Sequence, residues 1–253
     1  MIKRIVFAIV CIAINGTYGQ NGTASPYSYF GIGDLRSSAT VENQMMGGMG
    51  IYADSIHINL QNPAGYSKLR LTTYTAGISR RELRLKSFTE EQSTSITNLD
   101  YLALGFRVGK GLGMGFGLRP YTSVGYNIVS EAINEVGETV TTQFIGEGGL
   151  NKVYFSVGYE FMKDLSVGVT ASFNFGTLES DRIQGVEDIQ LGTLDRRRSR
   201  VNGVDFNYAL YYTPKIKDKY TLHASARVNT QANLVSKNTE EIGSFVLNSL
   251  QDL

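Results

Sequence analysis

The most constraining feature of this sequence is an alternation of apolar and polar residues from Asn151 to Gly176. The polar pair Lys163-Asp164 divides the stretch into two arms, and both arms keep a period of two residues. This period is typical of a β-strand with two different faces. The stretch therefore predicts a β-hairpin, with these residues on its apolar face: Val153, Phe155, Val157, Tyr159, Phe161, Leu165, Val167, Val169, Ala171, Phe173 and Phe175.

The length of the two arms leaves two environments open for this hairpin. Each arm has about ten residues, which is the length that a tilted strand needs to cross a bilayer. In a soluble sandwich the apolar face would point into the core. In an outer-membrane barrel that face would point to lipid and the polar face would line the lumen. The barrel would place four polar residues in the lumen: Lys152, Glu160, Thr170 and Asn174.

Residues 1–19 predict a secretory signal peptide. Lys3 and Arg4 precede an apolar run over residues 5–14, and small residues stand where a signal peptidase cleaves, so we expect cleavage after Gly19. The run is too short to span a membrane as a helix. Cys11 is the only cysteine of the chain, so the mature protein has no disulfide and is not a small disulfide scaffold.

The composition favours a barrel over other exported proteins. Removal of the signal peptide changes the formal charge from +1 to about −1, which indicates no nucleic-acid partner. The chain has 28 Gly, 15 Tyr and 12 Phe but only 4 Pro among 253 residues. This balance is more typical of a β-barrel than of a periplasmic enzyme. After the signal peptide no apolar run approaches 18 residues, so no transmembrane helix is expected.

The remaining chain divides into two regions. Residues 20–66 predict a compact, mostly irregular module with short helical pieces, and residues 67–253 predict the β-region. Short connections alternate with long polar ones along the β-region, as they do in bacterial outer-membrane barrels. Strands are expected near 69–86, 98–109, 112–127, 150–162, 165–178, 200–213 and 219–231. The long loops are expected at 87–97, 128–149 and 179–199.

The second face of these strands carries charged residues in mid-strand, among them Arg107, Arg119 and Arg227. A charge on the lipid face would cost about 2–4 kcal/mol at the bilayer midplane, so this face is expected to line the lumen. About seven strands are counted, whereas bacterial single-chain barrels have an even number. We therefore expect that the sequence lacks C-terminal strands.

The N-terminal module together with the strands resembles the FadL-type family of outer-membrane transporters, in a divergent branch. The resemblance depends on Met46-Gly47-Gly48-Met49-Gly50, Tyr52-Ala53-Asp54-Ser55 and Asn62-Pro63-Ala64-Gly65-Tyr66. It covers residues 25–66 specifically, and the rest only as barrel strands. The resemblance implies a 14-stranded barrel with an N-terminal hatch in its lumen. The hatch motif would comprise Gly47, Gly48, Gly50, Asn62, Pro63 and Ala64.

Two further patterns have non-catalytic interpretations. The glycines at 109, 111, 113, 115 and 117 have a spacing of two, which places them on one strand face and does not match a dinucleotide loop. Because glycine has no side chain, this face predicts space in the lumen for a plug. Asp54, Ser55 and His57 include the residue types of a catalytic triad, but close sequence neighbours rarely meet its geometry. We expect no enzyme activity.

No cofactor is expected either. The chain has only two histidines and no mature cysteine, which argues against a His/Cys metal site. A calcium site in a loop near Asp181, Glu187 and Asp188 remains an open alternative.

Two surface features have candidate partners. Four arginines form the densest charge run, at the end of the loop predicted at 179–199, and could contact lipopolysaccharide phosphates or a partner; a solvated loop is the alternative. They are Arg196, Arg197, Arg198 and Arg200. Three methionines could form a soft apolar contact with a ligand or partner, with plug packing as the alternative. They are Met45, Met46 and Met49.

The sequence thus predicts an outer-membrane barrel with lipid and lipopolysaccharide around it. The leading function is passive, hatch-gated transport of hydrophobic small molecules such as long-chain fatty acids. The alternative is an accessory or scaffold subunit of an outer-membrane protein assembly or secretion complex, with other outer-membrane proteins as its partners.

Overall fold

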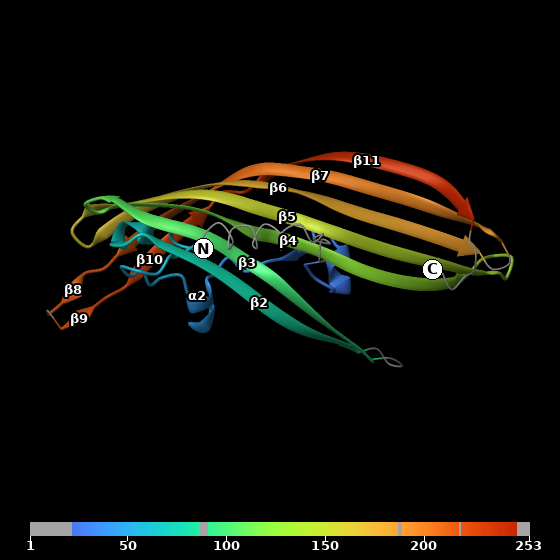
Figure 1. The fold of residues 1–253 in the computed structure, drawn as a ribbon, viewed down its shortest axis with the longest axis horizontal. Helices are drawn as coiled ribbons and strands as arrows, with labels where there is room; N and C mark the ends of the chain where they lie inside the picture. Colours follow the sequence, from blue (N-terminus) through green and yellow to red (C-terminus); the bar gives the residue numbers. More distant parts are fainter. Residues whose placement is uncertain (1–21, 87–90, 187–188, 218, 247–253) are drawn as a thin grey trace, which may run out of the picture.

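The computed structural model describes residues 22–86, 91–186, 189–217 and 219–246, and its main element is one long antiparallel sheet (Figure 1). The strand order is β10-β7-β6-β5-β4-β3-β2, with β1 also paired to β4 and β11 also paired to β7. The predicted all-β antiparallel class is therefore confirmed. The main strands are β2 (Thr73–Lys86), β3 (Glu91–Gly109), β4 (Leu112–Ile133), β5 (Thr139–Met162), β6 (Leu165–Val186), β7 (Leu191–Tyr212), β10 (Ala224–Asn229) and β11 (Asn233–Val246).

The strands are longer than predicted, and all three predicted loops are largely wrong at the residues that the structure describes. Residues 91–97 of the loop predicted at 87–97 belong to β3. Residues 128–149 and 179–199 mostly continue β4 to β7, which have 22 to 24 residues each. These ends carry polar residues on both faces, so the alternating pattern disappears there although backbone pairing continues. Opposite charges stand across the strands, as in Asp181 opposite Arg196 and Glu179 opposite Arg198, and such cross-strand pairs stabilise a sheet.

Two more differences concern the C-terminal part. The polar stretch after residue 231 forms β11, which the sequence analysis missed, because Glu240 and Glu241 stand opposite Arg197 and Arg196 of β7. The predicted strand at 219–231 is divided into β9 (Tyr220–Thr221) and β10, and β9 pairs with β8 (Lys215–Ile216) in a small separate hairpin.

The two faces of the sheet alternate as the central hairpin predicts. Apolar side chains such as Val153, Phe155 and Phe173 are exposed on the outer face. Lys152, Thr170 and Asn174 are buried, although they are polar. They are buried because the N-terminal segment, defined here as residues 22–72, lies against their face on the concave side of the sheet (Figure 1).

The N-terminal segment has little regular structure. Its elements are η1 (Pro26–Tyr29), β1 (Asp34–Leu35), α2 (Val41–Met45) and η2 (Pro63–Lys68). Both η helices are 3-10 helices. The predicted signal peptide, residues 1–19, lies outside the described residues. Within the described part of the chain, no helix is long and apolar enough to cross a membrane.

Candidate docking site on the N-terminal segment

The helix η2 is seated directly on glycines of the sheet. Gly113 of β4 faces the Tyr66 carbonyl, and a Cβ on that glycine would overlap it. A Cβ on Gly158 of β5 or on Gly168 of β6 would likewise overlap the backbone of residues 63–67. Only glycine lets two backbones approach so closely. These strand glycines therefore make the seat that holds the N-terminal segment.

The predicted Asn-Pro-Ala motif begins this helix. Asn62 is the N-cap of η2, and its side-chain oxygen accepts a hydrogen bond of 3.1 Å from the Ala64 amide. Pro63 occupies the first turn, where a missing N–H costs nothing. Asn62, Pro63 and Ala64 are all buried. The motif therefore fixes the start of the seated helix.

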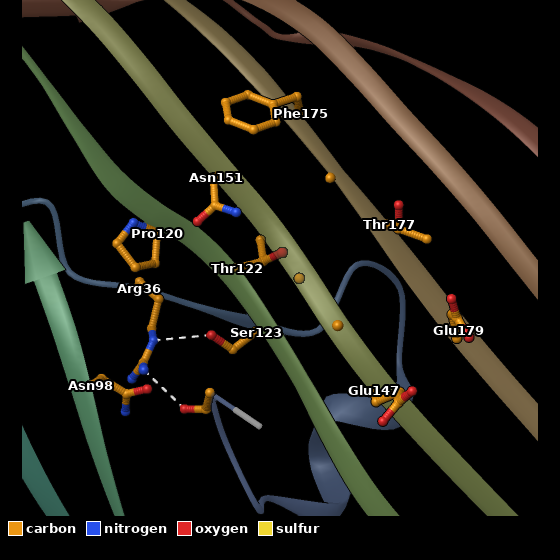
Figure 2. Close-up of a pocket in the computed structure, with 14 residues that line it drawn as sticks. Arg36, Asn98, Pro120, Thr122, Ser123, Glu147, Asn151, Phe175, Thr177 and Glu179 are labelled. Atoms are coloured by element: carbon orange, nitrogen blue, oxygen red, sulfur yellow. Dashed lines mark hydrogen bonds between the residues drawn. The ribbon is translucent and has the colours of Figure 1, made fainter. Parts of the chain in front are cut away.

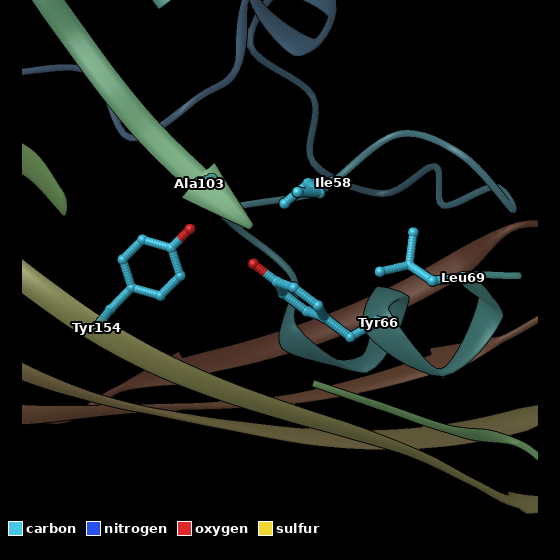
Figure 3. Packing of buried hydrophobic residues seen from close by; sticks show 5 residues of the cluster. All are labelled: Ile58, Tyr66, Leu69, Ala103 and Tyr154. Atoms are coloured by element: carbon cyan, nitrogen blue, oxygen red, sulfur yellow. The ribbon is translucent and has the colours of Figure 1, made fainter. Parts of the chain in front are cut away.

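A small apolar cluster holds the other side of η2 (Figure 3). Its members come from the N-terminal segment, from β3 and from β5, and Leu60 packs against them. Burial raises the pKa of Tyr66 to about 12, so its hydroxyl stays neutral. The buried members are Ile58, Tyr66, Leu69, Ala103 and Tyr154.

Polar side chains of the sheet complete the seat. Lys152 Nζ lies 2.7 Å from Asp205 Oδ2, and the Asn174 amide donates to the same oxygen at 2.6 Å. The Ser67 hydroxyl donates to Ser166 Oγ at 2.8 Å. Lys68 reaches Glu160 Oε1 at 3.1 Å. Buried polar groups are tolerated in such a layer when they are paired.

A second anchor lies near the start of the segment (Figure 2). The Arg36 guanidinium donates to Ser123 Oγ at 3.1 Å and to the Gly22 carbonyl at 2.9 Å. The two residues of β1 pair with Thr122 and Ser123 of β4. A cavity of about 650 Å³ lies beside this contact, next to the glycine-rich part of β5. Arg36 thus ties the segment to β4 at a second place, besides the seat of η2.

Asn59 organises the loop between the two anchors. Its side-chain oxygen accepts hydrogen bonds from the amides of Gln61 and Asn62 and from the Asn43 side chain. Its side-chain nitrogen donates to the carbonyls of Gly50 and Tyr52. Sequence reasoning missed Asn59, and only its position three residues before the Asn-Pro motif could have marked it.

The loop that Asn59 holds presents an exposed apolar groove, which we call the methionine groove. Met45, Met46 and Tyr52 line it, and its volume is about 500 Å³. Met45, Met46, Met49 and Tyr52 are all exposed, so the alternative of plug packing does not describe them. Methionine suits a contact surface because its side chain adapts to different partners.

The glycines of the predicted motif shape the turn beside this groove. Gly47 and Gly48 follow α2 with positive φ angles of 73° and 79°, which glycine adopts without strain. Nothing lies near the position that a Cβ would occupy on either of them. Gly50 instead packs against the Gln61 side chain. The motif therefore has a turn role at two positions and a packing role at the third.

Asp54 and His57 form a pair at the rim of the methionine groove. His57 Nδ1 lies 2.6 Å from Asp54 Oδ2. The hydrogen bond from Asp54 raises the pKa of His57 above its usual value. Burial alone would raise the pKa of Asp54, but hydrogen bonds from His57 and from the Ile56 amide lower it. The carbonyl of the nearby Ser55 accepts a hydrogen bond from the Arg70 amide. The Ile56 and His57 amides donate to the Asp54 side chain, so residues 54–57 form a capped turn.

The predicted arginine run lies in β7 and not in a loop. Arg196 binds Asp181 through two nitrogens, Arg198 binds Glu179, and Arg197 binds Glu240. These ion pairs join β6, β7 and β11. Arg200 stands opposite Lys237, and neither has an ion-pair partner within the described residues.

The structure describes only one of the three residues named for the alternative of a calcium site. The Asp181 carboxylate forms an ion pair with Arg196, while Glu187 and Asp188 lie outside the described residues. Across the described ranges, no group of three or more His, Cys, Asp or Glu side chains could hold a metal ion.

Comparison with protein families adds the decisive observation. The family described as BamG matches residues 1–253. The chain belongs to the BamG family. This family is associated with the machinery of outer-membrane assembly, and the β-rich fold agrees with outer-membrane association. Comparisons with curated proteins and with solved structures gave no significant match.

Membership in the BamG family corrects two sequence-based interpretations. The assignment to the FadL-type transporters is wrong, and so is the leading function of hatch-gated fatty-acid transport. The Asn-Pro-Ala motif misled the assignment because it reports how a helix is capped and seated on a sheet. That physical requirement does not depend on what the protein does.

Proposed function

We propose that this chain is an accessory subunit of the outer-membrane assembly machinery. The observation that supports this proposal most strongly is the match of the BamG family to residues 1–253. In this proposal, residues 1–19 direct export, and the sheet forms the wall of a transmembrane barrel whose exposed apolar face contacts lipid. Its partners are other outer-membrane proteins of the assembly complex. No catalytic role is proposed.

The apolar outer face supports the membrane part of the proposal. Val153, Phe155, Val169, Phe173 and Phe206 are all exposed, and each stands on the face away from the N-terminal segment. Exposure of so many large apolar side chains to water would be unfavourable, at about 25 cal/mol for each Å². Lipid is the environment that suits this face.

The methionine groove supports the subunit part of the proposal. It is held open by Asn59 and by the α2 turn, and it lies on the N-terminal segment away from the apolar outer face. A rigidly held apolar groove is suited to receive a side chain of a partner protein.

Photo-crosslinking in the native membrane tests this proposal. A photoreactive residue at Met45, which is exposed and lines the methionine groove, is expected to crosslink to a protein of the assembly machinery. The same residue at Phe173 is expected to crosslink to lipid. Mass spectrometry identifies the crosslinked protein. The proposal is wrong if neither the crosslinks nor gentle detergent purification recovers an assembly protein in stoichiometric amount.

A further inference from the structure

The inner polar cavity lies between the N-terminal segment and strands β4, β5, β6, β7 and β10. It has a volume of about 280 Å³. Four cationic side chains line it, and Asp205 is the one carboxylate among its lining residues, so their formal charge is +3. The four are Arg36, Arg119, Lys152 and Arg227.

The pairing within the cavity leaves Arg119 without a direct partner in the described part of the chain, whereas Arg36 donates to Ser123 and to the Gly22 carbonyl and is attracted by Asp100 and Asp34. Among the described residues, Arg119 forms no ion pair and donates no hydrogen bond. The carboxylate that attracts it electrostatically is Asp205, which Lys152 and Asn174 already bind. Lys152 is buried and Arg119 is half-buried, whereas Arg227 is exposed. Gathering like charges at a partly buried site is unfavourable unless an anion enters.

Unpartnered polar atoms indicate that something else occupies the cavity. The Tyr154 hydroxyl, Gln61 Oε1 and Asn207 Oδ1 line it, are buried, and lack a hydrogen-bond partner among the described residues. Buried polar atoms are nearly always paired in folded proteins. Water can serve the two amide oxygens, and the hydroxyl can donate to an oxyanion.

We propose that the inner polar cavity binds a phosphate group, carried by a small phosphate compound or by a lipid headgroup. Arginine guanidinium groups match the oxygens of phosphate, and the excess of cations favours a dianion over a carboxylate. Arg36 belongs to the N-terminal segment, whereas Arg119 and Lys152 belong to the sheet. The bound phosphate therefore clamps the segment to the sheet.

Binding to the purified full chain in detergent tests the proposal, with inorganic phosphate as the probe and chloride at equal ionic strength as the reference. Phosphate is expected to bind and to slow proteolysis of the N-terminal segment. Arg119→Gln is expected to weaken binding about tenfold, because it removes a charge-assisted hydrogen bond. Arg84→Gln, at an exposed position of β2 outside the lining of the cavity, is the matched control and is expected to bind as the wild type does.

Two further arms identify the source of the phosphate. Binding of glycerol 3-phosphate without retained lipid points to a small compound. A phospholipid or lipid A that stays bound in native mass spectrometry, and is lost in Arg119→Gln, points to a headgroup. The proposal is overturned if phosphate acts no differently from chloride, or if both variants bind equally. These assays use the isolated chain, so their outcome is independent of the proposed role in assembly.

Discussion

Lys152 of β5 and Asp205 of β7 form an ion pair of 2.7 Å across the strand that separates them. Asn174 of the intervening β6 donates to the same carboxylate, so one acceptor joins three adjacent strands beneath the N-terminal segment. Both charges are largely buried. A charge in such a place is stable only with its partner present.

Asp205→Asn is therefore expected to destabilise the folded protein by about 3–5 kcal/mol, because it leaves the Lys152 charge buried and unpaired. Urea unfolding in detergent measures this free energy. The double variant Lys152→Met, Asp205→Leu is expected to recover most of the loss. Glu179→Gln, which breaks an exposed pair with Arg198, should unfold close to wild type. Equal stability of Asp205→Asn and Glu179→Gln would contradict the account of this pair.

The glycine seat gives a second prediction. Gly168→Ala places a Cβ against the backbone of Pro63 and Ala64, which belong to a seated helix and cannot move aside cheaply. We expect a loss of about 1–3 kcal/mol, together with faster proteolysis within the N-terminal segment. Gly243→Ala is the matched control, since it is also a strand glycine but has open space around it. Unchanged proteolysis of Gly168→Ala would show that η2 does not depend on this close approach.

Asn59 gives a third prediction. Asn59→Ala removes hydrogen bonds to five other residues, so we expect a loss of about 2–4 kcal/mol and early cleavage of residues 43–62. Melting in detergent and limited proteolysis measure the two effects. Asn233→Ala, at the exposed start of β11, is the control. If both variants have the melting temperature of the wild type, Asn59 does not organise the loop.

The Asp54–His57 pair predicts a dependence on pH. The pKa of His57 is higher in the folded protein than its usual value of about 6.5. Protonated His57 therefore stabilises the fold fully below pH 6.5, and this stabilisation is lost as the pH rises through the pKa of the folded protein. The lowered pKa of Asp54 means that its contribution is present above its usual value of 3.8 and is lost as pH falls through the folded value. The loop around the pair should be most stable between these limits.

NMR titration of the His57 ring measures this effect. Asp54→Asn is expected to return the pKa of His57 toward its ordinary value. Glu42→Gln should change it less, because Glu42 acts on His57 only through a weaker charge interaction. A His57 pKa that does not respond to Asp54→Asn would show that the pair is absent in solution.

The sequence predicted the two-faced sheet well because each face has one consistent environment. Val153 and Phe173 are exposed and Lys152 and Asn174 are buried, as the two-residue period required. The period failed where both faces become polar, near Arg196 and Glu240, because backbone pairing and cross-strand charges continue without alternation. Pattern alone cannot separate such a strand end from a loop.

The candidate site was less accessible from the sequence. The prediction that the glycines near 113 leave room beside the strand agrees with the position of Tyr66, which lies against Gly113 and Gly115. Asn59 and the pairing of Lys152 with Asp205 depend on contacts between distant parts of the chain. Such contacts leave no local signal. The transport hypothesis failed because a motif that seats a helix was taken as evidence of function.

Depletion in the native cell tests the central claim most directly. The chain is placed under a repressible promoter, and the rate at which pulse-labelled outer-membrane barrels reach their folded, heat-modifiable form is measured after its loss. An accessory assembly subunit predicts slower maturation that wild-type protein restores and that Asn59→Ala restores only in part. Maturation at the wild-type rate, with depletion verified by immunoblot, would contradict the account.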